Sequence, residues 1–230
     1  LTVTTRRAIL ASTSSLFGYA TWKVRSDPLH LVWDLDNTLI CSISPVPAKD
    51  DPRYLSQRPS DYFDHIDDDF PYEEDTPNTR TYFRPGARVV LSLCGLIAKQ
   101  HVFTTAQETY ARNLLGKLDP DGTVFESVSH RDMYPHAVKE GKDLALVTDR
   151  LDRAILFDDR LDNFDPQIGK NGVLVAKYVD VGKNDVLELL EMCRLVCIAA
   201  LAHLCPDARN VVKFFWSDGH KERFSVKKTM

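Results

Sequence analysis

Apolar residues in this chain fall into short runs that are separated by longer, mixed stretches and by turn sequences. The first run, Leu29–Trp33, is followed directly by Asp34. Near-continuous apolar runs of this length are typical of strands that are buried on both faces of a parallel sheet. The pattern predicts five strands, and the other four are expected at 101–104, 123–128, 154–157 and 173–176.

Three longer stretches predict helices. The first opens at residues 84–86 and is expected to run to about Lys99, because proline is favoured in the first helical turn. The second ends near Leu118, before the turn sequence of residues 119–122. The third is expected over 185–203 and begins with a capping-box spacing. Strands that alternate with helices predict an α/β fold with a central parallel sheet and right-handed crossovers.

Length and composition fit one globular domain. The chain has 230 residues and a mass of 26.1 kDa, with 43% hydrophobic and 27% charged residues, which excludes disordered, collagen-like and fibrous classes. Its 5 cysteines, an odd number without metal-type spacing, indicate reduced thiols and favour a reducing compartment. Cys193 and Cys197 lie on the apolar face of the expected third helix, where we expect both to pack in the core.

The net charge of −4 conceals three zones and argues against a generic nucleic-acid binder. Residues 1–26 carry four basic residues and no acid, whereas residues 50–75 carry ten acids against two arginines. The last 21 residues carry five basic residues and two acids. The acidic zone lies within 43–82, a stretch without periodicity that we expect to be a surface insertion.

These zones divide the chain into a basic N-terminal segment (1–27), a domain (28–204, with the acidic insertion at 43–82) and a basic C-terminal extension (205–230). The N-terminal segment has an apolar run over 8–20 that is too short and too polar to predict a spanning helix. A targeting peptide, a membrane anchor and an amphipathic helix docked on the domain remain open for it. The role of the extension remains open as well.

Polar residues follow three of the predicted strands: Asp34 and Asp36 the first, Thr104 the second, and Asp158 and Asp159 the fourth. A single aspartate after a strand is more often a turn former or helix cap, so the inference rests on the joint pattern. Ligands of parallel sheets bind beyond the carboxyl ends of the strands, and clustered carboxylates favour Mg²⁺. The pattern indicates phosphoryl transfer, with a nucleophile, a general acid and base, and a lysine that balances charge.

The segment Trp33–Leu39 (WDLDNTL) resembles the D-x-D-x-T/V motif of the haloacid dehalogenase superfamily of phosphotransferases. Further stretches are similar to motifs of one branch of that superfamily, the RNA polymerase II C-terminal-domain phosphatases, also called NLI-interacting-factor-like phosphatases. They are Arg84–Gly86 (RPG), Val102–Thr105 (VFTT), Lys142–Leu144 (KDL) and Leu156–Asp159 (LFDD). The resemblance covers roughly residues 28–204. It implies a parallel sheet with helices on both faces and a small insertion in place of a large cap.

The resemblance also implies catalytic roles. Asp34 would be the nucleophile and Asp36 the general acid and base. Thr104 would contact the phosphate, and Lys142 would stabilise the phosphoryl charge and the nucleophile. The alternative lysine, Lys139, lacks the Asp-Leu that follows in the motif.

For the metal, the resemblance implies Mg²⁺ held by Asp34, the backbone carbonyl of Asp36 and Asp159, with Asp158 in support. The branch usually has asparagine where this chain has Asp159. Arg131 resembles a substrate-contacting position, and a plain surface arginine remains the alternative.

These implications predict a Mg²⁺-dependent phosphatase that acts on Ser/Thr phosphoproteins through an aspartyl-phosphate. A second hypothesis is a presequence-binding subunit of the mitochondrial inner-membrane import translocase, which resembles this branch in fold; the basic start and acidic patch suit it, but intact catalytic residues favour an enzyme. A membrane-tethered phosphatase of lipid-metabolism or nuclear-envelope regulators is a third. Expected partners are a phosphoprotein or, for the alternatives, translocase or membrane-regulatory proteins, and no nucleic acid. A mitochondrial and a nuclear or cytoplasmic membrane-associated location both remain open.

Overall fold

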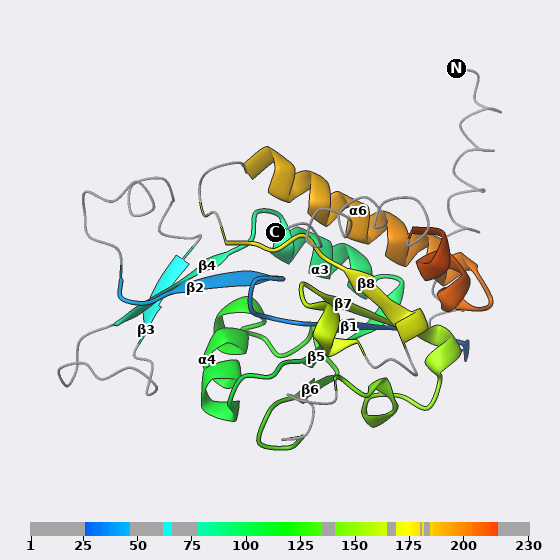
Figure 1. Cartoon of the computed structure of the whole chain (residues 1–230), viewed down its shortest axis with the longest axis horizontal. Coiled ribbons are helices and arrows are strands. Elements are labelled where there is room, and N and C mark those ends of the chain that lie inside the picture. The colour runs from blue at the N-terminus through cyan, green and yellow to red at the C-terminus, as the bar shows by residue number, and fades with distance from the viewer. Residues whose placement is uncertain are drawn as a thin grey trace, which may run out of the picture.

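A five-stranded parallel sheet forms the centre of the fold (Figure 1). The computed structural model describes residues 26–46, 62–65, 78–134, 141–164, 169–179, 181 and 185–215. In spatial order the strands are β6 (Ser127–Ser129), β5 (Ala98–Phe103), β1 (Leu29–Trp33), β7 (Ala154–Asp158) and β8 (Gly172–Leu174). The predicted α/β fold class is confirmed, and each predicted strand has a counterpart.

The two faces of this sheet bury different clusters, because side chains alternate along each strand. On one face Trp33 stacks on Phe157, with ring centroids 4.5 Å apart, inside the larger core cluster. On the other face Val32 and Phe103 belong to a smaller cluster. Asp34 lies two residues after Val32, so its side chain points to the smaller cluster's face.

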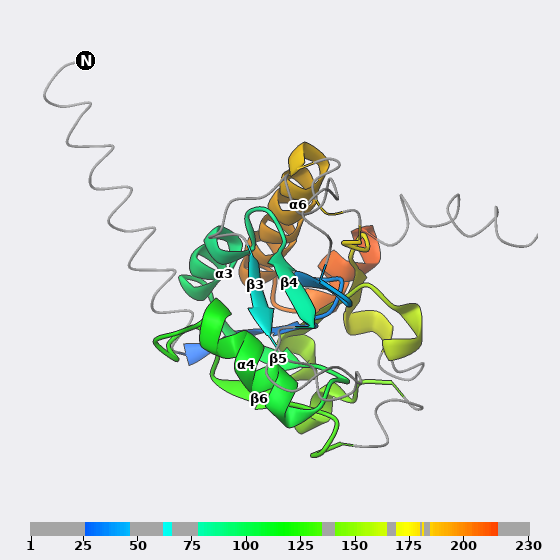
Figure 2. The ribbon, with the colours of Figure 1, turned by 90° about the vertical axis from the view of Figure 1, so that its left-hand side faces the viewer.

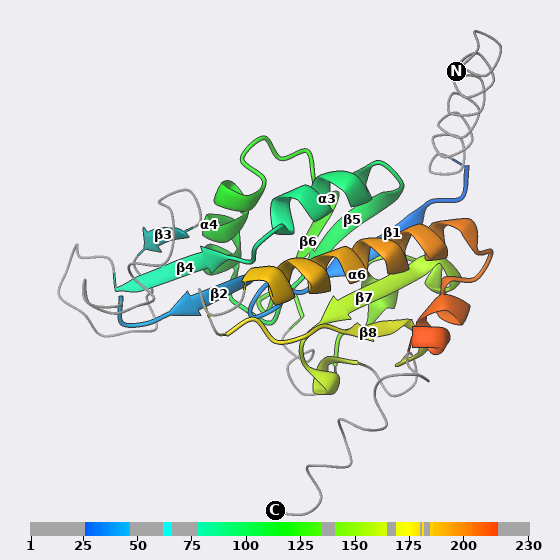
Figure 3. The same cartoon turned by 90° about the horizontal axis from the view of Figure 1, so that it is seen from above.

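Three α-helices pack on the larger cluster: α3 (Ala87–Gly95), α4 (Glu108–Leu118) and α6 (Asp185–Leu204). Seen from above, α6 lies lengthwise across the sheet beside α3 (Figure 3). Residues 208–215 are also helical. The smaller cluster is covered by the 3₁₀ turns η1 (Leu144–Leu146) and η2 (Leu151–Arg153), with η3 (Leu161–Asn163) and η4 (Gly169–Asn171) after β7.

The buried Arg153 ties the end of α6 to the first described residues. Its guanidinium donates to the carbonyl oxygens of Ala202 (3.1 Å) and Cys205 at the C-terminal end of α6. It also forms an ion pair with Asp27 (3.4 Å). A cation at this end of a helix satisfies carbonyls that have no partner within the helix.

A smaller antiparallel sheet, in the order β2-β4-β3, lies beside the central one; Figure 2 looks onto this end, with β3 and β4 in front. Its strands are β2 (Ile40–Ile43), β3 (Tyr62–His65) and β4 (Thr79–Phe83). Residues 43–82 were predicted to be a surface insertion without periodicity; β3 and β4 form within this stretch, and all five residues of β4 are buried. Polar residues in these strands are paired across the sheet; Arg80, for example, donates two hydrogen bonds to Asp64 (2.5 and 2.7 Å). Because polar residues occupy positions inside the strands, the sequence shows no apolar periodicity there. Residues 47–61 and 66–77 lie outside the described part.

Several element boundaries differ from the sequence prediction. Helix α3 ends at Gly95 instead of about Lys99, and β5 begins at Ala98. Strand β6 begins at Ser127 instead of residue 123, because the carboxylate of Asp119 accepts the N–H groups of residues 123–125 (2.9 to 3.2 Å) and so occupies their donors.

Cys193 and Cys197 are exposed, so the prediction that both pack in the core was wrong. The sequence of α6 is apolar on nearly all sides, and its pattern did not show which side faces the sheet. Met192, Leu195 and Ile198 form the buried side instead. In the described part of the chain, no helix has the length and hydropathy needed to cross a membrane.

The buried His101, with the half-buried His30 beside it, makes the stability of the fold sensitive to acid. His101 Nε2 lies 3.0 Å from His30 Nδ1, and His101 Nδ1 lies 2.8 Å from Ser127 Oγ. Burial, assisted by His30, lowers the pKa of His101 from 6.5 to about 4. Below pH 6.5 His101 binds a proton in the unfolded chain but stays neutral in the folded chain. The free energy of unfolding therefore falls as the pH drops from 6.5 towards 4.

We expect this loss to be on the order of 2 kcal/mol and to shrink in His101→Gln, whose side chain does not titrate. Urea unfolding of both proteins at pH 7 and pH 4.5 measures it. Equal losses in the two proteins would contradict this account of His101.

Candidate active site

The register of the central sheet places two of the predicted acids side by side. Trp33 pairs with Phe157, so Asp34 and Asp158 lie next to each other at the carboxyl end of adjacent strands. The N–H of Asp34 donates to the carbonyl oxygen of Phe157 (3.0 Å). Both aspartates are buried, and neighbouring strands are only about 4.8 Å apart. Two carboxylates at this spacing repel each other unless a positive charge or a proton lies between them.

Lys142 supplies that charge. Its Nζ donates to Asp34 Oδ1 (2.5 Å) and to Asp158 Oδ2 (2.7 Å), and its side chain is completely buried. Burial lowers the pKa of Lys142, but the two carboxylates outweigh this effect and raise the pKa overall. Burial raises the pKa of Asp34 to about 8, against the opposing effect of Lys142. The three side chains therefore form one electrostatic unit.

Asn163 holds two members of this unit in place. Its side-chain Nδ2 donates to both carboxylate oxygens of Asp158 (2.9 Å each). Its backbone carbonyl oxygen accepts the backbone N–H of Lys142 (2.8 Å). The N–H of Arg160 adds a hydrogen bond to Asp158 Oδ1 (2.8 Å). Sequence reasoning missed Asn163, because an asparagine in a short loop carries no distinctive pattern.

Asp159 lies beside this unit with unsatisfied acceptors. Among the described residues, neither of its buried carboxylate oxygens has a hydrogen-bond partner, although Lys177 Nζ lies 3.9 Å from Oδ2. Burial and Asp158 raise the pKa of Asp159. One oxygen each from Asp34, Asp158 and Asp159 lie within 4.8 Å of one another. Three converging carboxylates, one with orphaned oxygens, fit a hard dication such as Mg²⁺.

Asp36 is oriented by a hydrogen-bond chain that reaches the smaller sheet. The hydroxyl of Tyr110 on α4 donates to Asp36 Oδ1 (2.6 Å) and lies 2.7 Å from Ser42 Oγ on β2. Ser42 Oγ in turn lies 2.7 Å from Thr81 Oγ1 on β4. The side chain of Asp36 is thus held by Tyr110 on α4 and, through Tyr110, is connected to the smaller sheet.

Arg84 supports the loop between Asp34 and β2. Its buried guanidinium donates to the carbonyl oxygen of Thr38 (3.0 Å) and forms an ion pair with Glu188 on α6 (2.6 Å). The N–H of Tyr178 donates to the carbonyl oxygen of Asn37 (2.7 Å), in the same loop. The Arg84–Gly86 stretch thereby contributes a residue that links this loop to α6.

Thr104 and Arg131 each form a hydrogen bond with the turn after β5. Thr104 Oγ1 accepts the N–H of Ala106 (3.1 Å), and Arg131 Nε donates to the carbonyl oxygen of Thr105 (2.6 Å). Both residues lie at the same sheet edge as Asp34, since β5 neighbours β1. The alternative lysine, Lys139, lies outside the described residues.

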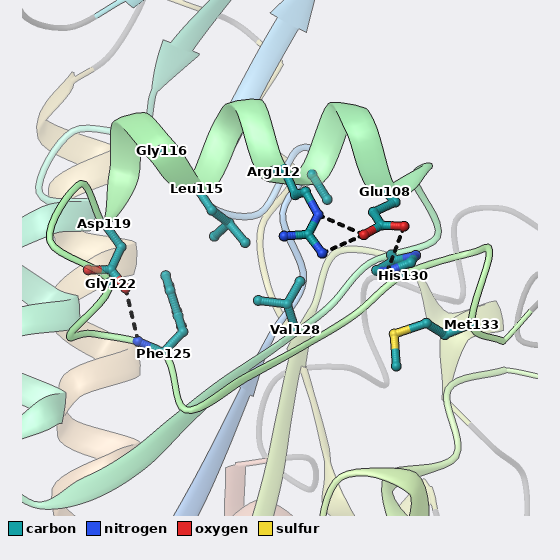
Figure 4. A pocket seen from close by; sticks show the side chains of 11 residues that line it. Glu108, Arg112, Leu115, Gly116, Asp119, Gly122, Phe125, Val128, His130 and Met133 are labelled. Carbon is teal, nitrogen blue, oxygen red and sulfur yellow. Dashed lines mark hydrogen bonds and ion pairs between the residues drawn. The ribbon is translucent and has the colours of Figure 1, made fainter.

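A cavity of about 510 Å³ lies between α4 and β6 and is lined by none of the predicted site residues (Figure 4). At one end His130 lies 3.8 Å from Glu108 and 3.5 Å from Asp132. These carboxylates already have other partners: Glu108 pairs with Arg112 (2.5 Å), and Asp132 accepts the N–H of Glu108 (2.7 Å). This cluster therefore caps and braces α4.

The central sheet, with acids after β1 and β7 and a lysine between them, is the arrangement of a haloacid dehalogenase-type fold. The NLI interacting factor-like phosphatase family matches residues 29–208, and the chain belongs to this family. No curated protein matches the chain.

Two solved structures are similar in fold. One is the fission yeast RNA polymerase II CTD phosphatase Fcp1, in a variant bound to beryllium fluoride, at 19% identity and a TM-score of 0.55 over 86% of this chain and 57% of that chain. The other is a structure of Fcp1 described as an essential RNA polymerase II CTD phosphatase, at 21% identity and a TM-score of 0.55 over 86% of this chain and 55% of that chain. The chain thus spans little more than half the length of these proteins.

Removal of Lys142 should destabilise the fold strongly. We expect Lys142→Met to cost about 3–5 kcal/mol in the free energy of unfolding, because it leaves two buried carboxylates without a counter-charge. Lys99→Met, which removes an exposed ion pair to Glu126, should cost less than about 1 kcal/mol. Urea unfolding measures both.

Adding Asp34→Asn to Lys142→Met should restore part of the lost stability, because one of the repelling charges is then absent. A double variant that is less stable than Lys142→Met alone would contradict the charge account.

Proposed function

We propose that this chain is a Mg²⁺-dependent phosphoprotein phosphatase, specific for Ser/Thr phosphoesters, that works through an aspartyl-phosphate on Asp34. The observation that carries the proposal is the buried Lys142, which contacts both Asp34 and Asp158 while Asp159 keeps two orphaned oxygens beside them. Membership of the NLI interacting factor-like phosphatase family supports the reaction class.

Each residue has a defined task in the proposed reaction. A carboxylate oxygen of Asp34 attacks phosphorus, and the bond between phosphorus and the Ser/Thr oxygen breaks. Asp36 gives its proton to the leaving oxygen, then takes a proton from the water that attacks the phosphorylated Asp34 and releases inorganic phosphate. Lys142 offsets the charge that gathers on the transferring group. Thr104 and Arg131 lie at the same sheet edge. In the proposed reaction Thr104 binds the phosphate, and Arg131 contacts the substrate.

The carboxylates of Asp34, Asp158 and Asp159, with the backbone carbonyl of Asp36, would hold Mg²⁺. When bound, the ion shields the phosphate charge from the acids around it. These residues supply oxygen ligands only, which suits a hard cation. Asp159 in place of asparagine adds one negative charge, and Lys177 at 3.9 Å offsets part of it.

Specificity for Ser/Thr phosphoproteins is supported by the fold similarity to Fcp1, named as an RNA polymerase II CTD phosphatase. The translocase hypothesis rests on residues 1–26 and 50–75, which lie almost entirely outside the described residues. It therefore remains a hypothesis from the sequence, as do its partners and location.

The proposed nucleophile is tested by Asp34→Asn. We expect this variant to lose at least about 1,000-fold in kcat for a generic aryl phosphate, because an amide does not attack phosphorus. The matched control, Asp162→Asn, changes a side chain that is 90% exposed and should keep full activity. Chelation of Mg²⁺ should abolish wild-type hydrolysis. Hydrolysis that survives both Asp34→Asn and the chelator would overturn the mechanism.

Tyr110 should act as a positioning residue for Asp36. We expect Tyr110→Phe to lower kcat by about 10-fold with little change in KM and to shift the pH dependence of kcat, since it removes a donor from the general acid. Tyr134→Phe, in a ring that packs on Phe103, is the matched control. A change in thermal stability with an unaltered pH profile would instead indicate a purely structural role for Tyr110.

A further inference from the structure

Seen from above, no other described helix or strand lies over the outer side of α6 (Figure 3). Apolar residues of this helix are exposed there. Six valine and leucine residues of this helix are between 46 and 68% exposed. With about 160 to 180 Å² for a whole valine or leucine, they expose roughly 600 Å² together, the upper end of the apolar patches found on monomeric proteins. They are Val186, Leu187, Leu189, Leu190, Leu201 and Leu204.

The residues at the centre of this side repeat every seven positions. Val186, Cys193 and Ala200 form one row, and Leu190, Cys197 and Leu204 form the other; all six are exposed. Alternating steps of four and three residues produce the narrow seam by which one helix packs along another. We call these six residues the α6 seam.

Three charged side chains of α6 have partners within the domain or within the helix. Glu188 pairs with Arg84 inside the domain, and Glu191 accepts the N–H of Ala176 (2.8 Å). Arg194, at the margin, is paired with Glu191 (2.5 Å) and donates to the carbonyl oxygen of Leu174 (2.9 Å). An uncharged face of this kind meets an identical face without like-charge repulsion.

We propose that the α6 seam is a self-association surface, on which α6 of a second copy of this chain packs antiparallel. The two-fold axis would cross α6 at the level of Leu195, and each seam residue would meet one of complementary size. Leu190 meets Ala200 of the second copy, and Cys193 meets Cys197 of the second copy. Val186 meets Leu204 at the ends. A parallel arrangement would instead place Ala200 against Ala200 and leave a gap in the seam.

The available area is sufficient for such a pair. Two copies that covered all six exposed valine and leucine residues of both α6 helices would bury about 1,200 Å² in total, which is at the lower end of stable protein interfaces. Helix α3, which packs beside α6, also has exposed apolar residues, Val89 and Leu93, and Leu96 at its C-terminal end is exposed as well. This inference concerns a surface apart from the catalytic residues and stands whether or not the proposed reaction is correct.

Sedimentation equilibrium of the full chain tests the association. We expect a monomer–dimer equilibrium that Leu190→Glu weakens by at least about 10-fold in Kd, with Leu204→Glu as a second seam variant. Leu146→Glu, an equally drastic change at a 45% exposed leucine of η1, is the matched control. Circular dichroism checks that each variant is folded. A chain that stays monomeric up to about 100 µM, or a dimer that the seam variants leave unchanged, would overturn the proposal.

Disulfide trapping tests the antiparallel order. In a Cys205→Ser background, an added mild oxidant should link two chains between Cys193 and Cys197. Cys193→Ala alone and Cys197→Ala alone should each lose the cross-link, because each remaining thiol then faces alanine. An equimolar mixture of the two variants should regain it. Cross-linking of either single variant with itself would refute the antiparallel packing.

Discussion

The ion pairs of Lys142 with Asp34 and Asp158 are the constraint on which the rest of the site depends. Parallel pairing of β1 with β7 forces two carboxylates together in a buried place, and such an arrangement is unstable without a cation. The lysine comes from a segment without helix or strand of its own, so that segment must be held as firmly as the strands. Asn163 holds the segment through hydrogen bonds to the backbone N–H of Lys142 and to the carboxylate of Asp158.

The arrangement also separates the two acids of the first motif into different environments. Asp34 lies against a buried cation, where burial raises its pKa and Lys142 opposes the rise. Asp36 is bonded to the hydroxyl of Tyr110, whose other contacts lead to the smaller sheet. Two carboxylates two residues apart thus acquire different chemistry, because one is fixed by the central sheet and the other by α4 and β2. A nucleophile and a proton donor require such a difference.

Sequence patterns predicted β1 and β7 well, because these strands are near-continuous apolar runs followed by aspartate. Strands β5 and β6 contain polar residues, and the predicted starts of both were displaced. The patterns failed for the smaller sheet, where β4 buries Thr79, Arg80 and Thr81 together with aromatic residues. Burial of polar residues there depends on cross-strand partners that are distant in sequence, and periodicity does not report them. The same reason hid Asn163 and Glu188, which act only through contacts made in the fold.

For α6 the failure was of another kind and is more informative. The sequence of a helix that is apolar on nearly all sides does not show which side faces the core. For this reason Cys193 and Cys197 were predicted to be buried, although both are exposed. In the fold, charged residues determine which side of α6 faces the domain. Glu188 and Glu191 have partners in the domain, so the opposite side of the helix faces outward. At about 100° per residue, Glu188 lies nearly opposite the centre of the α6 seam. The ion pair between Glu188 and Arg84, which supports the loop between Asp34 and β2, is therefore also the contact that orients α6 with the seam facing outward. Packing of a second copy on the seam would bury the outer side of α6 and leave the Arg84 contact and the carboxyl edge of the sheet as they are.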